Sequence, residues 1–369
     1  MPKSVKITAK KIGELAGCCQ QAVSATLSGH GNSKVSDEKR EKILTLARNL
    51  NYRPNPSALR LSGRSTKTIG IISENSIFCS EFQLGLATRF RVHGYESIFV
   101  PLVTNFEEDF QIGKLLDYGV DGIVSLNKQG NFEQSSLAVP SVLISYANYD
   151  VDFDWQGAAQ LAVSHLLGHG HQRIAFLSDV RQYSSENMRI GFERTLREKQ
   201  LDFSPGWFVE LVWNERYAVQ LLSLLRKEKV SAFFCTREGI AARLLVWLRR
   251  QKISVPEEVA VISATGSTYA ESCSPSLTAI AYPVHAITAA AVDLLIKKIR
   301  QNELKRTEKP ILIPPKLHLG HSCGCPESPM QTIWWEGLPL DLEEFDHQAY
   351  IFPEKKKIKD SEKTIPTKE

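Results

Sequence analysis

The sequence contains no long hydrophobic run, which excludes a chain anchored by membrane-spanning helices. No stretch approaches the ~18 consecutive apolar residues that such a helix requires. The first residues, MPKSVKITAKKIGELAG, are charged and lack the apolar core of a secretory signal peptide. We therefore expect a cytoplasmic protein with no membrane partner.

Cysteines and catalytic motifs are also sparse. Seven cysteines, an odd number, are scattered over 369 residues and do not resemble a disulfide framework. The sequence has no nucleophile motif, glycine-rich phosphate loop or paired acid–base signature. Carboxylates such as Asp152, Asp154, Glu186 and Glu238 stand alone. We expect no enzymatic activity and no cofactor.

A strong asymmetry of charge, in contrast, is present. Residues 1–67 hold 13 Lys and Arg against four Asp and Glu, a net charge of +9, whereas the rest of the chain carries −5. A small basic head on a mildly acidic body favours a polyanion as the partner of the head. A charge cluster alone is more often a solvated face than a binding site. The residue pattern of the head therefore has to show whether it binds a polyanion.

The head has the pattern of three short helices. Thr8 can cap the first, Gly17 can supply the turn to a second at about 20–28, and Ser36 can cap a third. The residues expected to face the core are Ala9, Ile12, Leu15, Ala16, Val23, Leu27, Ile43, Ala47 and Leu50. Helix, glycine-containing turn and helix is the helix-turn-helix pattern, although an ordinary three-helix bundle would share it.

A short segment, NYRPNPSALRLSG (51–63), joins this head to the body. Asn55 can cap a helix, Pro56 suits its first position, and Gly63 can end it. Helices shorter than ~12–15 residues are marginal in water. We therefore expect this helix of about two turns to need a partner that holds it.

The body, from residue 68 to about 325, alternates strand-like runs with amphipathic helices. Strands are expected at 69–73, 96–102, 121–126 and 140–146, then at 173–178, 207–212, 231–235, 259–264 and 277–282. Helices are expected near 80–93, 107–118, 156–168, 186–199, 216–228, 238–251 and 285–301, the last returning to the first lobe. Two such series predict an α/β fold with two doubly wound parallel-sheet lobes and a cleft between them.

These residues resemble the lac repressor/galactose repressor family of bacterial transcription regulators. The resemblance runs from Ile7 to Ile72 through ITAKKIGELAG, QAVSATLSG and VSDEKREKILTLARNLNYRPNPSALRLSGRSTKTIGII. In the body, GYESIFV, VDGIV, AVSHLLGHGHQRIAFLS, ISVPEEVAVIS and SPSLTAIAYP look like landmarks of the family's effector domain. That domain is similar to periplasmic sugar-binding proteins, here without an export signal.

The resemblance implies four parts of the chain. They are a helix-turn-helix DNA-binding domain (1–53), a hinge helix and linker (54–67), a two-lobed effector-binding and dimerisation domain (68–325), and a partly disordered C-terminal extension (326–369). It also implies a sequence-specific regulator, a repressor, that binds a pseudo-palindromic operator in double-stranded DNA as a homodimer. Such a protein works in the bacterial cytoplasm, associated with the nucleoid.

The family pattern implies base contacts in the major groove for Gln20, Gln21 and Ser24. Glutamine can bond adenine through two hydrogen bonds, and serine can bond either a base or a phosphate. Contacts to the DNA backbone are implied for Thr8, Lys34, Ser36, Tyr52 and Asn55. In the hinge, Leu61 corresponds to a wedge inserted into the minor groove, and Ala58 is small enough for two hinge helices to approach each other.

Two residues of the DNA-binding site depart from the family. Cys19 stands where a serine usually caps the recognition helix, a loss of ~0.5–2 kcal/mol. Ala25 stands where an arginine often reads a guanine, so one contact worth ~1–3 kcal/mol is missing. We expect the operator to differ at that base pair.

The effector pocket departs further. The implied lining residues are Phe78, Tyr146, Met188, Arg189, Arg237 and Thr265. Met188 stands where an arginine is common, and Arg237 and Thr265 replace acidic residues that accept hydrogen bonds from sugar hydroxyls. Two hypotheses follow: an anionic ligand, such as an acidic or phosphorylated sugar, or a pocket that has lost ligand binding. A cytoplasmic small-molecule-binding protein whose head serves only assembly is the alternative from another class.

Two segments raise the question of a metal. His165 and His169 are four residues apart, and HLGHSCGC (318–325) places two His and two Cys within eight residues. The first pair falls in a family landmark, where packing and capping explain it. The second segment has the pattern of a last strand running into a loop, and its spacing is not a usual zinc pattern. We therefore predict no metal site.

Overall fold

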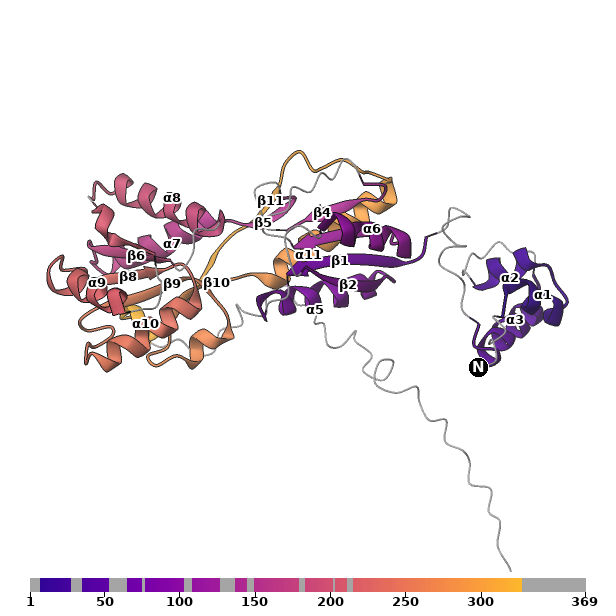
Figure 1. The fold of residues 1–369 in the computed structure, drawn as a ribbon, viewed down its shortest axis with the longest axis horizontal. Coiled ribbons are helices and arrows are strands. Elements are labelled where there is room, and N and C mark those ends of the chain that lie inside the picture. Colours follow the sequence, from indigo (N-terminus) through magenta and orange to yellow (C-terminus); the bar gives the residue numbers. More distant parts are fainter. Residues whose placement is uncertain are drawn as a thin grey trace, which may run out of the picture.

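The computed structural model describes residues 7–27, 35–52, 65–74, 77–102, 108–126, 137–144, 149–178, 183–201, 203–210 and 215–326. They form a helical head and an α/β body with two lobes (Figure 1). None of the helices in these ranges is long and apolar enough to cross a membrane.

The head contains α1 (Ala9–Ala16), α2 (Gln20–Leu27) and α3 (Asp37–Asn49). The Thr8 hydroxyl accepts a hydrogen bond from Lys11 N, and Gly17 ends α1 in the left-handed conformation at φ 70°. The Ser36 hydroxyl likewise accepts from Lys39 N at the start of α3. These contacts confirm the predicted caps and place α1 and α2 one tight turn apart.

The core of the head differs from the prediction at one residue. Ile12, Val23 and Ile43 are fully buried, but Leu15 is 44% exposed. Successive helical residues are rotated by about 100°, so Leu15 lies beside the stripe of Ala9, Ile12 and Ala16 rather than on it. The expectation that Leu15 faces the core was wrong.

The N lobe is built on a parallel sheet in the order β2-β1-β3-β4. Its strands are β1 (Thr68–Glu74), β2 (Glu96–Leu102), β3 (Gly122–Leu126) and β4 (Ser141–Leu143). Its helices are α5 (Ile77–Val92), α6 (Glu108–Tyr118) and α11 (Val284–Gln301). α5 and α11 pack together on one face and α6 covers the other, which confirms that the long helix near the end returns to the first lobe.

The C lobe is built on a six-stranded sheet in the order β12-β10-β9-β8-β6-β7, in which only β12 is antiparallel. The strands are β6 (Ile174–Ser178), β7 (Phe208–Glu210), β8 (Ala232–Cys235), β9 (Ala260–Gly266), β10 (Thr278–Ala281) and β12 (Lys316–His318). The helices are α7 (Trp155–Gly168), α8 (Tyr183–Glu198), α9 (Glu215–Arg226) and α10 (Glu238–Arg250). α7 and α8 cover one face, and α9 and α10 cover the other.

Short additional elements lie between and beside the lobes. β5 (Val151–Phe153) and β11 (Ile311–Ile313) form a small parallel sheet of their own near the crossing of the lobes. Single turns of 3₁₀ helix are η2 (Pro205–Trp207), η3 (Thr268–Ser272) and η4 (His321–Cys323). β5 and β11 were not predicted. The last strand that was expected in 318–325 corresponds to β12, which begins earlier and ends at His318.

Close packing of α7 against α8 depends on a glycine. A Cβ atom at Gly191 would lie 2.4 Å from the carbonyl oxygen of Gln156, closer than real atoms approach. Gly191 therefore lets the two helices meet backbone to backbone.

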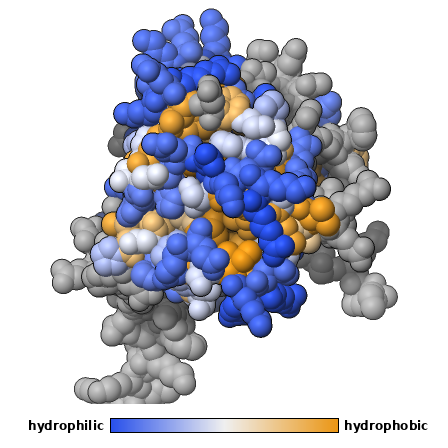
Figure 2. Space-filling view, turned by 90° about the vertical axis from the view of Figure 1, so that its left-hand side faces the viewer, coloured by the Kyte–Doolittle hydropathy of each residue, from blue (hydrophilic) through white to orange (hydrophobic). Residues whose placement is uncertain are grey.

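The outer end of the C lobe shows mostly hydrophilic side chains with smaller apolar areas between them (Figure 2).

Candidate functional site: a cleft between two lobes and an exposed recognition helix

The direction of the strands shows which ends of the two sheets face each other. β10 continues through Tyr282 and Pro283 into α11 of the N lobe, so β10 ends on the side that faces that lobe. β6 to β9 run parallel with β10 and end on the same side. β5 leads into α7 of the C lobe, and Val151 pairs in parallel with Ile144 after β4. The N-lobe strands therefore end facing the C lobe.

Buried hydroxyl groups collect at these strand ends. In the N lobe β1 lies between β2 and β3, and in the C lobe β6 lies between β7 and β8. The strand order reverses at these points, which is where ligands bind in open α/β sheets. In the N lobe, the Ser73 hydroxyl at the end of β1 accepts a hydrogen bond from Gln83. In the C lobe, Thr236 after β8 donates to the Ser178 hydroxyl at the end of β6. Both lobes thus present polar groups at the position expected for a ligand.

Arg237 and Thr265 lie close to this point. Arg237 precedes α10, directly after β8, and Thr265 lies on the adjacent strand β9, where its hydroxyl donates to Thr236 O. The two residues that were predicted to shift the pocket towards donors therefore come from neighbouring strands. Their role in ligand binding stays a prediction.

An acidic group stands next to Arg237, and sequence reasoning had treated it as isolated. The Glu238 carboxylate accepts hydrogen bonds from Ser267 N at 3.0 Å and Ser267 Oγ at 2.7 Å. Burial raises the pKa of the Glu238 carboxyl, the bonds from Ser267 lower it, and the charge of Glu81 on α5 raises it again. Carboxylates of both lobes thus lie near each other, so the region between the lobes offers hydrogen-bond acceptors.

The other predicted pocket residues do not join this group. Met188 is 1% exposed and packs in the core between α7 and α8. Arg189 pairs with Glu186 at 3.2 Å and lies over the Phe208 ring at the β7 edge of the sheet, where it lines a cavity of about 820 Å³. The side chains of Phe78 and Tyr146 lie outside the part of the chain that the structure describes.

Aromatic rings mark the crossing between the lobes. Trp155 stacks on Tyr282 with ring centroids 5.4 Å apart, and Phe153 meets both rings edge-on. Tyr282 also lies 6.0 Å from Phe82 of α5. The Trp155 indole N–H donates to both oxygens of Asp152 at 3.1 Å, beside a small cavity of about 200 Å³. The crossing segments are therefore packed against each other and against α5 through aromatic rings.

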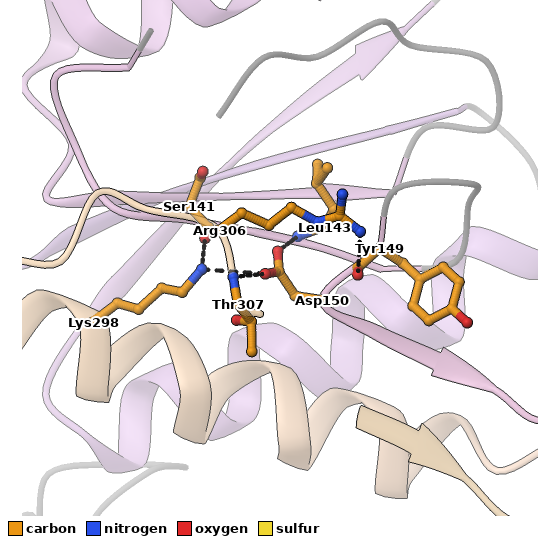
Figure 3. A network of polar contacts seen from close by, with 7 residues as sticks. All are labelled: Ser141, Leu143, Tyr149, Asp150, Lys298, Arg306 and Thr307. Atoms are coloured by element: carbon orange, nitrogen blue, oxygen red, sulfur yellow. Dashed lines mark hydrogen bonds and ion pairs between the residues drawn. The ribbon is translucent and has the colours of Figure 1, made fainter. Parts of the chain in front are cut away.

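A polar network fastens the same crossing to the C-terminal end of α11 (Figure 3). The Lys298 ammonium is buried and lies 3.2 Å from Asp150 Oδ1, and it also donates to Ser141 O. Asp150 accepts two further bonds, from Leu143 N at 2.9 Å and Thr307 N at 3.0 Å. This buried pair joins β4, the crossing segment before β5 and the chain that follows α11.

The recognition helix carries an exposed polar face. Gln20 and Gln21 are exposed, Ser24 and Ala25 are half-buried, and Val23 on the opposite side is fully buried in the core of the head. Cys19 is exposed immediately before α2. The caps Thr8 and Ser36 are exposed and Tyr52 is partly buried against the head. This arrangement leaves the glutamines free to reach a partner.

The hinge residues Asn55, Ala58 and Leu61, and Lys34 in the head, lie outside the described residues. The segment after the hinge is held by Asp121, a residue that sequence reasoning missed. Its carboxylate accepts hydrogen bonds from Thr66 N at 3.0 Å, Lys67 N at 2.8 Å and the Ser65 hydroxyl. The chain leaving the hinge is thereby fixed to the start of β3, within the VDGIV landmark.

Four potential metal ligands also come together, on the C lobe. His165 and His169 of α7 meet Cys323 of η4 and Cys325, with all four ligand atoms within 4.8 Å of one another. The prediction of no metal site considered the two segments one at a time.

Comparisons with known proteins agree with this architecture. Residues 163–323 match the periplasmic binding protein-like domain. The chain is 28% identical over 319 residues to catabolite control protein A of Streptococcus mutans, covering 82% of this chain and 94% of that protein. It is 26% identical over 317 residues to the ribose operon repressor of Haemophilus influenzae, covering 81% and 94%. Over most of its length the chain is thus similar to regulators of the kind that its sequence resembles, the lac repressor/galactose repressor family.

Solved structures of the family share the fold. A lac repressor dimer bound to operator and the anti-inducer ONPF superposes with a TM-score of 0.72 at 21% identity, covering 86% of this chain and 99% of that one. The regulator CelR in its cellobiose complex gives 0.58 at 23% identity with the same coverage. At such identities the likeness concerns the fold.

Proposed function

We propose that this protein is a sequence-specific transcriptional repressor that binds a pseudo-palindromic DNA operator as a homodimer. The observation that carries the proposal is the exposed face of α2, with Gln20 and Gln21 outward on a basic head whose core is closed behind them. Glutamines so placed can read base edges in the major groove. The relatives named as repressors, and the lac repressor bound to operator, support this function. As a DNA-binding regulator, it would act in the bacterial cytoplasm.

The N lobe supports dimer formation. β2 is an edge strand, and large apolar side chains are exposed on it and on its flanking helices α5 and α6. These are Leu84, Val92, Phe99, Phe110 and Tyr118. Apolar side chains gathered at one edge are a feature of surfaces that meet a partner. A second copy of the chain fits best, because two heads are needed for two half-sites.

Selection of binding sites from random duplex DNA by the purified protein tests the proposal. We expect an inverted repeat whose half-sites are separated by a whole number of helical turns. A selected site without two-fold symmetry would contradict the homodimer. No enrichment at all would instead support a small-molecule-binding protein whose head serves only assembly.

Replacing Leu61 by Ala should weaken operator binding about 10- to 100-fold, because the wedge that unstacks a central base step is lost. Binding to non-specific DNA should stay nearly unchanged, since it depends on phosphate contacts. Fluorescence anisotropy with the selected and a scrambled duplex measures both. Leu312→Ala, at an exposed leucine of β11, serves as the control. An equal loss of affinity for both duplexes would show that Leu61 does not act as a wedge.

For the cleft we propose a ligand that combines an anionic group with hydroxyls, such as an acidic sugar. The anion would meet Arg237, and the hydroxyls would donate to acceptors such as Glu238. A cleft that has lost ligand binding is the competing proposal. The neighbouring carboxylates Glu238 and Glu81 favour the first, because carboxylate oxygens can accept further hydrogen bonds from the hydroxyls of a ligand.

A thermal-shift screen with acidic and neutral sugars separates these proposals. An acidic sugar at 100 times its Kd should raise the melting temperature by roughly 5–10 °C. Arg237→Gln should abolish that response, whereas Arg243→Gln, on the exposed side of the same helix, should retain it. Stabilisation by neutral sugars alone would contradict an anionic ligand, and no response to any sugar would support a cleft without ligand.

A further inference from the structure

We propose that His165, His169, Cys323 and Cys325 bind a structural zinc ion. The two histidines are four residues apart near the end of α7, so their rings lie on one face of the helix, with centroids 4.7 Å apart. The two cysteines come from η4 and the residue after Gly324, more than 150 residues further along the chain. The fold alone brings the two pairs together.

The distances match a tetrahedral site. With Zn–S at about 2.3 Å and Zn–N at about 2.0–2.1 Å, the nitrogen-to-sulfur edges of a tetrahedron are about 3.6 Å long. His165 Nε2 lies 3.1 Å from Cys323 Sγ and 3.6 Å from Cys325 Sγ, and His169 Nε2 lies 3.2 Å from Cys325 Sγ. All four ligand atoms fit within a diameter of 4.8 Å. The three N–S distances differ from the ideal edge by at most about 0.5 Å, and the widest separation has to close by about 1 Å for one small ion to touch all four atoms.

The identity of the ligands selects the metal. Two sulfurs and two imidazole nitrogens in tetrahedral order are typical of zinc and unsuited to magnesium or calcium, which prefer oxygen. Two thiolates would balance the charge of a divalent ion, so the occupied site would be neutral. Four protein ligands fill the coordination shell and leave no position for substrate, which makes the site structural rather than catalytic.

Local structure positions the cysteines for this purpose. Gly324 has φ 92°, a conformation that side-chain-bearing residues rarely adopt, and it turns the chain between the two thiols. Gly320 crosses the start of β10 so closely that a Cβ atom there would lie 2.5 Å from the backbone of Leu277. Glycine is therefore needed at both positions, at Gly324 for the backbone conformation and at Gly320 for the close approach to β10.

A second layer of contacts holds the turn in place. The Ser322 hydroxyl is fully buried, donates to Val261 O at 2.6 Å and accepts from Thr278 N at 2.9 Å. The Thr278 hydroxyl lies 2.9 Å from Cys323 Sγ, where it can donate to a thiolate. His321 Nδ1 lies 2.9 Å from Cys325 O. Such hydrogen bonds to ligands and their neighbours are a regular feature of metal sites.

The position of the site indicates what zinc would do. Cys323 and Cys325 stand at the end of the folded C lobe, just before the extension that begins at Pro326. Zinc would fasten this end of the chain to α7, which packs on β9, β10 and β12. The ion would thus close the C lobe where no further strand or helix follows among the described residues.

Metal analysis of the full-length protein, purified under reducing conditions and without chelators, tests the proposal. We expect about one zinc per chain in the wild type and in Cys273→Ser, a matched cysteine of the same lobe outside the cluster. The double variant C323S/C325S should contain less than about a tenth as much. Removing zinc from the wild type should lower the melting temperature by roughly 5–10 °C, and adding it back should restore the value.

Cobalt(II) keeps the test decisive if the double variant fails to fold. Added to the zinc-free wild type, Co²⁺ should give the visible bands of a tetrahedral site and a sulfur-to-cobalt charge-transfer band. His169→Gln, at the exposed rim of the cluster, should shift those bands and weaken binding at least about tenfold. Reduced wild-type protein that holds no zinc and gives no sulfur-to-cobalt band would overturn the proposal, as would zinc retained by C323S/C325S.

Discussion

Replacing Lys298 by Met is expected to lower the free energy of unfolding by about 3–5 kcal/mol. The Lys298 side chain is only 2% exposed and that of Asp150 is fully buried, with 3.2 Å between Nζ and Oδ1. Methionine retains the apolar length of the side chain but leaves the Asp150 carboxylate buried without its cation. The cost arises from that unpaired charge rather than from lost packing.

Denaturant unfolding followed by circular dichroism measures this loss, and Lys297→Met is the matched control. Lys297 precedes Lys298 on α11 but is exposed, so its replacement should change the unfolding free energy by less than about 0.5 kcal/mol. Asp150→Asn combined with Lys298→Met should recover part of the loss, because it removes the unpaired charge. Equal small effects of K297M and K298M would show that the buried pair contributes nothing.

The double variant Q20A/Q21A is expected to bind the selected operator at least about 30-fold more weakly than the wild type. Each bidentate contact between glutamine and adenine is worth about 1–3 kcal/mol, and both side chains are exposed on α2. Binding to scrambled duplex should change little, because neither residue carries charge. The variant should therefore lose specificity rather than general affinity for DNA.

Anisotropy titrations with both duplexes measure the two affinities, and Q160A/Q301A is the control. Gln160 and Gln301 are exposed on α7 and α11 of the body, so their removal should leave both affinities unchanged. Melting temperatures of all variants should match that of the wild type, because none of these side chains is buried. If Q20A/Q21A kept the specificity of the wild type, base recognition would have to come from another part of the head.

Most of the fold could be predicted from local patterns. β2 was expected at 96–102 and spans Glu96–Leu102. The other strands and helices predicted within the described residues lie within a few residues of their expected positions. Buried parallel strands are recognised in a sequence as apolar runs, and amphipathic helices are recognised by the spacing of their apolar residues. β5 and β11 were not predicted because each has three residues and pairs with a strand from a distant part of the chain.

The sites depended on long-range contacts that no local pattern shows. Lys298 looks like one of several basic residues at the end of an amphipathic helix, and only the fold buries it against Asp150. His165 meets Cys323 across 158 residues. The sequence did not show that Glu238 accepts a hydrogen bond from Ser267, 29 residues later in the chain. It also did not show that Met188 is buried in the core. The caps Thr8 and Ser36, in contrast, were readable because their partners lie three residues away.

The central claim is that the head reads a specific sequence in duplex DNA. Titration of the full-length protein with its selected operator and with a scrambled duplex, each at about 50 and 200 mM salt, tests it most directly. We predict at least roughly 1,000-fold tighter binding to the operator at both salt concentrations, with both affinities falling steeply as salt increases. Equal affinity for the two duplexes, or binding that does not depend on salt, would contradict the account.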